Sequence, residues 1–233
     1  AHTADTHYYF TTQCLDAKKK GLVKKVVATI WENIPFNHET ISGRHEMKQR
    51  AIREVDLFIA TSQQAKRALI IEGCDVEKIR VIYPGIDLNR FTAKKNRHQK
   101  ATWLLFVGRL TKEKGVFTIL RTFLKLYKTS SNLRLHLCGD GEEKSDLLNF
   151  IQENGIAHAV KIESVAYADM PEVYKQADVF LLASHATKFW QEQFGMVLVE
   201  AMAMGIPIVA TRCGAIPEVV ADAGLLVDED DEN

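Results

Sequence analysis

The 233-residue sequence lacks the features that mark several classes of protein. Lys plus Arg and Asp plus Glu number 30 each, so no excess of one charge favours binding to nucleic acid. No apolar run approaches the roughly 20 residues of a membrane-spanning helix. The four cysteines form no CxxC pair, which disfavours zinc and leaves disulfides without support. We expect a protein of the reducing cytoplasm, and the basic residues between Lys18 and Lys25 leave peripheral contact with a membrane open.

The two ends of the sequence also lack common features. There is no initiating Met, and the first ten residues have neither the basic nor the apolar region of a signal peptide. The last residues, DEDDEN, come directly after an apolar segment. These features predict a fragment of a longer protein, with room for two domains or for one large α/β unit.

Short apolar segments alternate with helical segments along most of the chain. In the first part, strands are expected at residues 25–30, 55–60 and 80–83. In the second part, they are expected at residues 103–107, 133–138, 160–162, 179–182, 206–210 and 225–227. This alternation is typical of parallel βαβ units. Residues 92–100 have no apolar periodicity and predict a linker, so we expect one domain at 1–91 and another at 101–233.

Glycines and charged residues follow the predicted strands of the second domain. In an open parallel sheet, ligands bind beyond the carboxyl ends of the strands. The residues expected at this edge are Gly108 and Arg109, residues 139–141, residues 184–192, and Cys213 with Gly214. The sequence therefore predicts a single binding edge in the second domain.

Two of these loops suit phosphate binding to different degrees. In VGRLTKEKG, Arg109 and Lys114 are close enough in sequence for both to reach one diphosphate, Arg through its planar fork and Lys as a point charge. The alternative is a solvated loop with ordinary surface bases. GDGEE, from Gly139 to Glu143, contains only a lone GxG, and a tight turn between strand and helix explains it at least as well as a ligand does.

The stretch SHATKFWQEQFGMVLVEAMAMGIPIVA, residues 184–210, is the centre of the prediction. Residues 194–204 are apolar except for Gly195 and Glu200, so we expect a helix that is buried on nearly all sides. A buried carboxylate is costly unless it finds hydrogen-bond donors. Glu200 is therefore either paired with a base such as Arg212 or Arg109, or it serves a ligand rich in hydroxyl groups.

The start of this helix is a predicted anion site. Its first turn comprises Phe194, Gly195, Met196 and Val197. The unpaired N–H groups and the positive end of the helix dipole attract an anion, which Gly195 lets approach closely. Glu192 precedes the helix, so two carboxylates flank the site and can accept hydrogen bonds from a diol. A phosphorylated sugar fits this description.

Four stretches carry a resemblance to a known family. They are FVGRLTKEKG, LHLCGDGEE, DMPEVYKQADVFLLAS and EQFGMVLVEAMAMGIPIVATRCGAIPEVVADAGLLV. The chain resembles the retaining glycosyltransferases of family 4, over its whole second half and less sharply back to about Val26. The resemblance implies an α/β protein of the GT-B type, with two Rossmann-like, doubly wound parallel-sheet lobes, both truncated in this sequence.

The resemblance also implies roles for individual residues. Glu192 is the catalytic candidate because the matching glutamate faces the transferred sugar, and Glu200 would bind the ribose hydroxyls. Donor binding is assigned to Gly108, Arg109, Lys114, Phe194, Gly195, Met196, Val197 and Glu200. Arginine, lysine and the helix dipole would stabilise the departing nucleoside diphosphate, so we expect no metal and no cofactor other than the nucleotide-sugar donor.

The sequence departs from the family pattern at one position and leaves other functions open. Trp31, followed by Glu32, stands where many members have a histidine that reaches the donor sugar. We expect a retaining glycosyltransferase that transfers a sugar to a glycan, lipid-linked or small-molecule acceptor, with these 233 residues inactive by themselves. Another GT-B enzyme, such as a nucleotide-sugar epimerase, and a non-catalytic nucleotide-sugar binding module stay open.

Overall fold

The computed structural model describes residues 1–93 and 101–229. The chain divides into two compact units. The first comprises Ala1–Gly85 with Thr187–Phe194, and the second comprises Ile86–Ala186 with the residues from Gly195 onward. In this division the first part of the chain ends at Gly85, and the first unit includes a short segment from the second half of the chain. Most of the predicted linker, residues 94–100, lies outside the described residues.

The first unit contains a four-stranded parallel sheet in the order β1-β2-β3-β4. Its strands are β1 (His2–Ala4), β2 (Val27–Ile30), β3 (Leu57–Ala60) and β4 (Ile79–Val81). Its helices are α1 (Tyr9–Lys19), α2 (Arg44–Glu54), α3 (Gln63–Ile71) and the short 3-10 helix η1 (Val76–Lys78). Each connection steps to the next strand in the same direction, so right-handed crossovers place α1, α2 and α3 on one face.

The core of the first unit follows the predicted alternation of its strands. Ala28, Ile30 and Phe58 are buried, and the cap of α3 is the expected one, since Ser62 Oγ accepts a hydrogen bond from the Ala65 N–H at 3.1 Å. Strand β1 was not expected. Its sequence, HTA, has no apolar run, and it becomes a strand by pairing with β2 in the register His2 to Val27.

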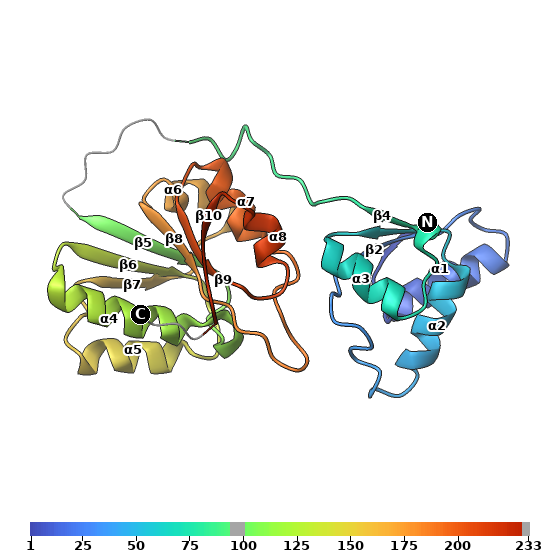
Figure 1. Cartoon of the computed structure of the whole chain (residues 1–233), viewed down its shortest axis with the longest axis horizontal. Coiled ribbons are helices and arrows are strands. Elements are labelled where there is room, and N and C mark those ends of the chain that lie inside the picture. Colours follow the sequence, from blue (N-terminus) through green and yellow to red (C-terminus); the bar gives the residue numbers. More distant parts are fainter. Residues whose placement is uncertain (94–100, 230–233) are drawn as a thin grey trace. The chain divides into compact units, whose positions relative to one another are not determined.

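The second unit contains a six-stranded parallel sheet in the order β10-β9-β8-β5-β6-β7 (Figure 1). Its strands are β5 (Thr102–Val107), β6 (Leu133–Cys138), β7 (Val160–Glu163), β8 (Val179–Leu182), β9 (Ile208–Thr211) and β10 (Gly224–Val227). Its helices are η2 (Lys112–Lys114), α4 (Val116–Thr129), α5 (Lys144–Glu153), η3 (Tyr167–Asp169), α6 (Met170–Tyr174), α7 (Met196–Ala203) and α8 (Ile216–Val220). The predicted class, α/β with two parallel sheets, is confirmed.

The winding of the second sheet reverses at β5. The chain runs outward from β5 to β6 and β7, and then returns to the other side of β5 with β8, β9 and β10. Accordingly α4 and α5 cover one face of the sheet, and α6, α7 and α8 cover the other (Figure 1). The loops after β5 and β8 leave the sheet toward opposite faces, which opens a crevice at the carboxyl edge of these strands.

The helix that carries Glu200 starts later than the sequence predicts. It runs from Met196 to Ala203, and Gly195 precedes it in the left-handed conformation with φ 84°. Phe194 and Gly195 are therefore not part of its first turn. The expected burial is found, since every residue of the helix is buried or half-buried.

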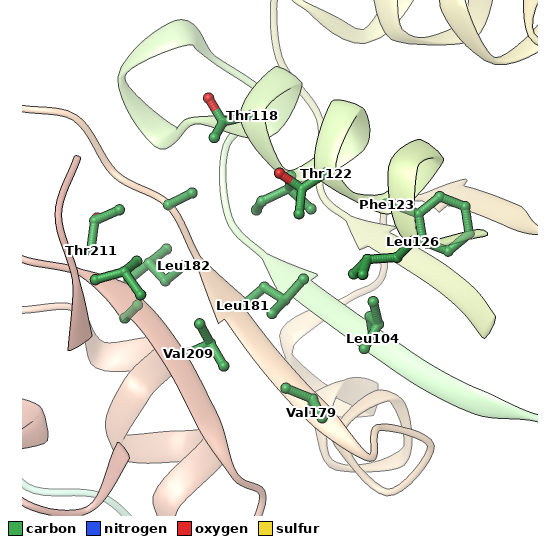
Figure 2. A pocket seen from close by; sticks show the side chains of 14 residues that line it. Leu104, Thr118, Thr122, Phe123, Leu126, Val179, Leu181, Leu182, Val209 and Thr211 are labelled. Atoms are coloured by element: carbon green, nitrogen blue, oxygen red, sulfur yellow. The ribbon is translucent and has the colours of Figure 1, made fainter. Parts of the chain in front are cut away.

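The face of the second sheet that carries α4 is only partly covered. Strands β8 and β9 bury Phe180 and Ile208 on the opposite face, whereas Leu181 and Val209, which alternate with them, are half-buried. On β10, Leu225 pairs with Val209 and is 61% exposed. An apolar hollow of about 270 Å³ lies here, between these strands and α4 (Figure 2). Among the described residues, this half of the face thus stays open.

Candidate functional site

A pocket of about 340 Å³ lies at the carboxyl edge of the second sheet. Its walls come from the ends of β5 and β6, from the loop after β7, and from α7. The lining residues are Val107, Gly108, Arg109, Cys138, Gly139, Asp140, Ser164, Val165, Tyr167, Met170, Val197 and Glu200. The pocket therefore occupies the crevice where the strand order reverses, as the ligand site of an open parallel sheet does.

Two backbone loops form one wall of the pocket and approach each other closely. A Cβ atom at Gly139 would lie 1.8 Å from the carbonyl oxygen of Gly108, and one at Gly141 would lie 2.4 Å from that of Leu110. The Leu110 N–H donates to the Asp140 carbonyl at 2.9 Å. The glycines of GDGEE are thus explained by backbone packing, and they keep side chains out of this wall.

Glu200 is buried, and its described hydrogen-bond partners are hydroxyl groups. Its side chain projects from α7, the residue is 5% exposed, and the Tyr174 hydroxyl donates to its Oε2 at 2.6 Å. Tyr167 lines the same pocket, and its hydroxyl also favours the ionised form of this carboxylate. Burial raises the pKa of Glu200, while the two hydroxyl groups and the positive charge of Arg90 act in the opposite direction.

The predicted structural alternative for Glu200 is not found. No described Lys or Arg side chain forms an ion pair with Glu200. Instead, Arg212 Nε lies 3.5 Å from Asp228 Oδ1. Arg109 lines the same pocket as Glu200. The carboxylate thus has no direct cationic partner among the described residues and contributes to the pocket wall.

The two predicted phosphate-binding cations are placed differently. Arg109 is exposed and lines the pocket. It also lies near Glu113, and its positive charge helps to lower the pKa of that carboxyl, to which the Glu113 backbone N–H contributes most. Lys114 ends η2 and is half-buried. Lys114 is not one of the described residues that line the pocket.

The start of α7 offers backbone donors to the pocket. No described side chain caps this helix, whose N-cap is Gly195. Val197, in the first turn, lines the pocket, and Met196 is half-buried beside it in the sequence. The first N–H groups of a helix have no partner within it, so this turn can bind an anion.

Glu192 and Phe194 belong to the first unit. The Glu192 carbonyl accepts a hydrogen bond from Asn33 Nδ2 at 2.9 Å. The ring of Phe194 packs edge-on against Trp31 with the centroids 6.5 Å apart, and also contacts Tyr83. Trp31 therefore packs against this segment. The structure brings Gly108, Arg109, Val197 and Glu200 into one pocket but places Glu192 and Phe194 in the other unit.

A second cluster of polar side chains was missed from the sequence. It lies where β1 and β2 end. Asp5 Oδ1 accepts the Trp31 N–H at 2.9 Å, and the rings of His7 and His38 lie 4.9 Å apart. His38 Nε2 is 3.3 Å from Glu32 Oε2. Burial, followed by repulsion from nearby positive groups, lowers the pKa of His7 to about 4. Its sequence signal, polar residues after an unrecognised strand, was too weak to identify it.

Two further kinds of site are not seen in the part of the chain that the structure describes. No three His, Cys, Asp or Glu side chains gather there to hold a metal ion. No helix among these residues has the length and apolar character needed to cross a bilayer.

Comparison with known families bears directly on this pocket. The model of the family described as glycosyl transferases group 1 matches residues 89–233, and that of glycosyltransferase family 4 matches residues 2–90. The chain belongs to the glycosyl transferases group 1 family. The resemblance inferred from the sequence is therefore confirmed, and the pocket lies within the matched group 1 segment.

Curated relatives of this glycosyltransferase-family chain are longer than the chain itself. The D-inositol 3-phosphate glycosyltransferase of Corynebacterium kroppenstedtii is 28% identical over 81% of this chain and 46% of that protein. The protein of the same name from Corynebacterium jeikeium is 32% identical over 81% of this chain and 49% of that protein. The chain spans about half the length of the curated relatives it matches.

A solved structure shares the fold of this family member. The crystal structure of Anabaena HepE in complex with UDP matches 95% of this chain and 63% of that chain, with a TM-score of 0.80 and 24% identity. At this identity the likeness establishes the fold alone, and it agrees with the predicted GT-B type. The roles of individual residues stay predictions.

Proposed function

We propose that the pocket of the second unit binds the nucleoside diphosphate of a nucleotide-sugar, and that the protein transfers the sugar to an acceptor with retention of configuration. One observation carries this proposal: a buried carboxylate, Glu200, that has hydroxyl rather than cationic partners lines a pocket together with Arg109 and the uncapped start of α7. This combination suits a ligand with hydroxyl donors at one end and a diphosphate at the other.

The geometry supports separate tasks for the parts of the pocket. The Glu200 carboxylate accepts hydrogen bonds from the ribose hydroxyls, because the tyrosines occupy only part of its acceptor capacity. The diphosphate lies against Arg109 and the N–H groups of α7. As the bond to the sugar breaks, charge develops on the diphosphate, and the guanidinium and the helix dipole stabilise it.

The remaining assignments rest on the family resemblance. Lys114 adds positive charge to the diphosphate, and Glu192 faces the transferred sugar. No step is assigned to a metal or to another cofactor. The acceptor is a glycan, a lipid-linked molecule or a small molecule. A cytoplasmic location, with or without contact with a membrane surface, belongs to the same proposal and is supported by four free cysteines.

Calorimetric titration tests the diphosphate site. UDP is the first ligand to use, since the HepE crystal contains it, followed by GDP and ADP. Arg109→Ala is expected to weaken UDP binding roughly 10- to 150-fold, the equivalent of one charge-assisted hydrogen bond, and to leave uridine binding unchanged. The control is Arg134→Ala, because Arg134 lies on β6, is not among the residues that line the pocket, and donates to the nearby Ser131 and Leu133 carbonyls.

Two outcomes would contradict the proposal. Equal losses for UDP and uridine would place the phosphates elsewhere, and absence of binding for all three nucleotides would remove the donor site. A non-catalytic binding module is the second candidate. Release of UDP from a UDP-sugar in the presence of an acceptor distinguishes a transferase from such a module.

A further inference from the structure

The segment that leads into the second sheet packs against Tyr167, a residue of the pocket wall. Residues 86–92 precede the sheet, and their backbone folds into a hydrogen-bonded turn. The N–H groups of Arg90 and Phe91 both donate to the Asp87 carbonyl, at 3.1 and 3.0 Å. The Thr92 hydroxyl donates to the Leu88 carbonyl at 3.1 Å. This segment is therefore a fixed structural element of the second unit.

Phe91 anchors this turn beside the tyrosines. It is 1% exposed, and its ring meets that of Tyr174 edge-on with the centroids 5.9 Å apart. The Phe91 ring also packs against the ring of Tyr167, with the centroids 6.3 Å apart. Burial of a phenylalanine in this way fixes the position of the adjacent residue, Arg90.

Arg90 makes two contacts with Tyr167. The guanidinium carbon lies 4.1 Å from the centre of the Tyr167 ring, and Nη2 donates to the Tyr167 carbonyl oxygen. Tyr167 is 57% exposed and lies on the short helix η3. An exposed side chain on a single turn has rotational freedom, which a cation over its ring and a bond to its carbonyl both restrict.

We propose that Arg90 is a positioning residue of the pocket: it fixes Tyr167 and, through the Tyr167 hydroxyl, orients the Glu200 carboxylate toward the ribose of a bound nucleotide. This inference rests on the proposed function for its ligand. Its structural part, the coupling of Arg90 to Glu200 through Tyr167, concerns the unliganded protein.

The charges around Glu200 agree with this role. The groups that act on the carboxylate are the Tyr174 hydroxyl from α6, the Tyr167 hydroxyl from η3 and the Arg90 cation, with Arg109 lining the same pocket. Burial raises the pKa of Glu200, whereas Arg90 lowers it. Arg90 therefore favours the ionised form, which is the stronger acceptor for ribose hydroxyls.

A titration of the unliganded chain tests the coupling independently of any nucleotide. The chemical shift of the Glu200 carboxyl carbon, Cδ, is followed by carbon-13 NMR as a function of pH. Its signal is assigned by its loss in Glu200→Gln. In Arg90→Ala the titration midpoint is expected to move to higher pH, and in Arg134→Ala it is expected to stay in place. An unchanged midpoint in Arg90→Ala would overturn the inference.

Nucleotide binding tests the consequence for the ribose. Arg90→Ala is expected to weaken UDP binding roughly 3- to 10-fold while 2′,3′-dideoxy-UDP changes less than about twofold. Tyr167→Phe removes only the hydroxyl and is expected to have the same selective effect. If Arg90 acts through Tyr167, the double variant loses no more than the larger single loss.

The outcomes separate this inference from the proposed function. Additive losses in the double variant, or equal losses for the two nucleotides, would show that Arg90 does not act through the hydroxyl of Tyr167. If the wild-type protein binds no UDP, the proposed function fails. The NMR titration then still decides whether Arg90 affects the ionisation of Glu200.

Discussion

Replacement of Glu200 by Gln distinguishes two roles of this carboxylate, binding the ribose of a nucleotide and stabilising the fold. The amide fills nearly the same volume, and its oxygen can still accept the hydrogen bond from Tyr174. The charge and one acceptor oxygen are lost. The matched control is Glu172→Gln, because Glu172 is an exposed residue of α6 that pairs with Lys175.

The structure sets the expected effect of Glu200→Gln on stability. Removing one partner of a buried ion pair costs about 3 to 5 kcal/mol, but no described basic side chain pairs with Glu200, so no cation is left unpaired. Burial raises the pKa of Glu200, which means that the folded state disfavours the charge. The stability that protonated Glu200 contributes is present at low pH and is lost as pH rises through the folded pKa. The variant, which carries no charge, should therefore gain stability relative to the wild-type protein as the pH rises from about 4.5 through the folded pKa of Glu200, and should differ from it by less than about 1 kcal/mol overall.

The effect on binding is expected to be much larger. Loss of a charged acceptor costs about 1.5 to 3 kcal/mol, which corresponds to a roughly 10- to 150-fold weaker affinity for UDP. The 2′,3′-dideoxy analogue cannot use this acceptor, so its affinity should change by less than about twofold. Calorimetry and thermal melts of the variant and its control measure both effects. A large fall in melting temperature with unchanged discrimination between the nucleotides would falsify the ribose assignment.

Two more predictions concern the rest of the structure. His7, with its pKa lowered to about 4, stabilises the fold while neutral. Relative to an unfolded pKa near 6.5, that contribution should fall by about 2 kcal/mol between pH 7.5 and pH 5. His7→Gln should remove this pH dependence of the free energy of unfolding, measured with denaturant, and the exposed control His158→Gln should retain it. The same pH dependence in both variants would refute the idea. Gly139→Ala places a Cβ atom 1.8 Å from the Gly108 carbonyl, and is expected to destabilise the fold by at least about 1 to 3 kcal/mol. Gly85→Ala, which meets nothing within 4 Å, should be near neutral, and a stable Gly139→Ala variant would contradict the packing argument.

The strands were predictable where apolar residues are continuous. Leu133–Cys138 and Val179–Leu182 have the predicted bounds, because buried parallel strands are apolar on both faces. His2–Ala4 could not be predicted, since this strand depends on its neighbour β2 rather than on its own residues. The start of α7 was placed too early because Phe194 is apolar, although the left-handed Gly195 separates it from the helix.

The candidate site was predictable as far as the sheet edge determines it. Gly108, Arg109 and residues 139–141 were expected at one edge, and Gly108, Arg109, Gly139 and Asp140 line one pocket. The tyrosine partners were not predictable, because Tyr174 lies 26 residues before Glu200 and the two meet only through tertiary packing. The division between Phe194 and Gly195 was equally hidden, since no change in composition marks it.

The choice of partner for Glu200 has a physical consequence for ligand binding. An arginine would neutralise the carboxylate and occupy both oxygens in a bidentate pair, which leaves little for a ligand. A tyrosine hydroxyl satisfies one acceptor position and leaves the negative charge in place. The cost of burying that charge then persists in the unliganded protein, as the raised pKa of Glu200 indicates. It is offset when ligand hydroxyls donate to the carboxylate, so a tyrosine-bonded Glu200 favours a ligand site over a structural ion pair.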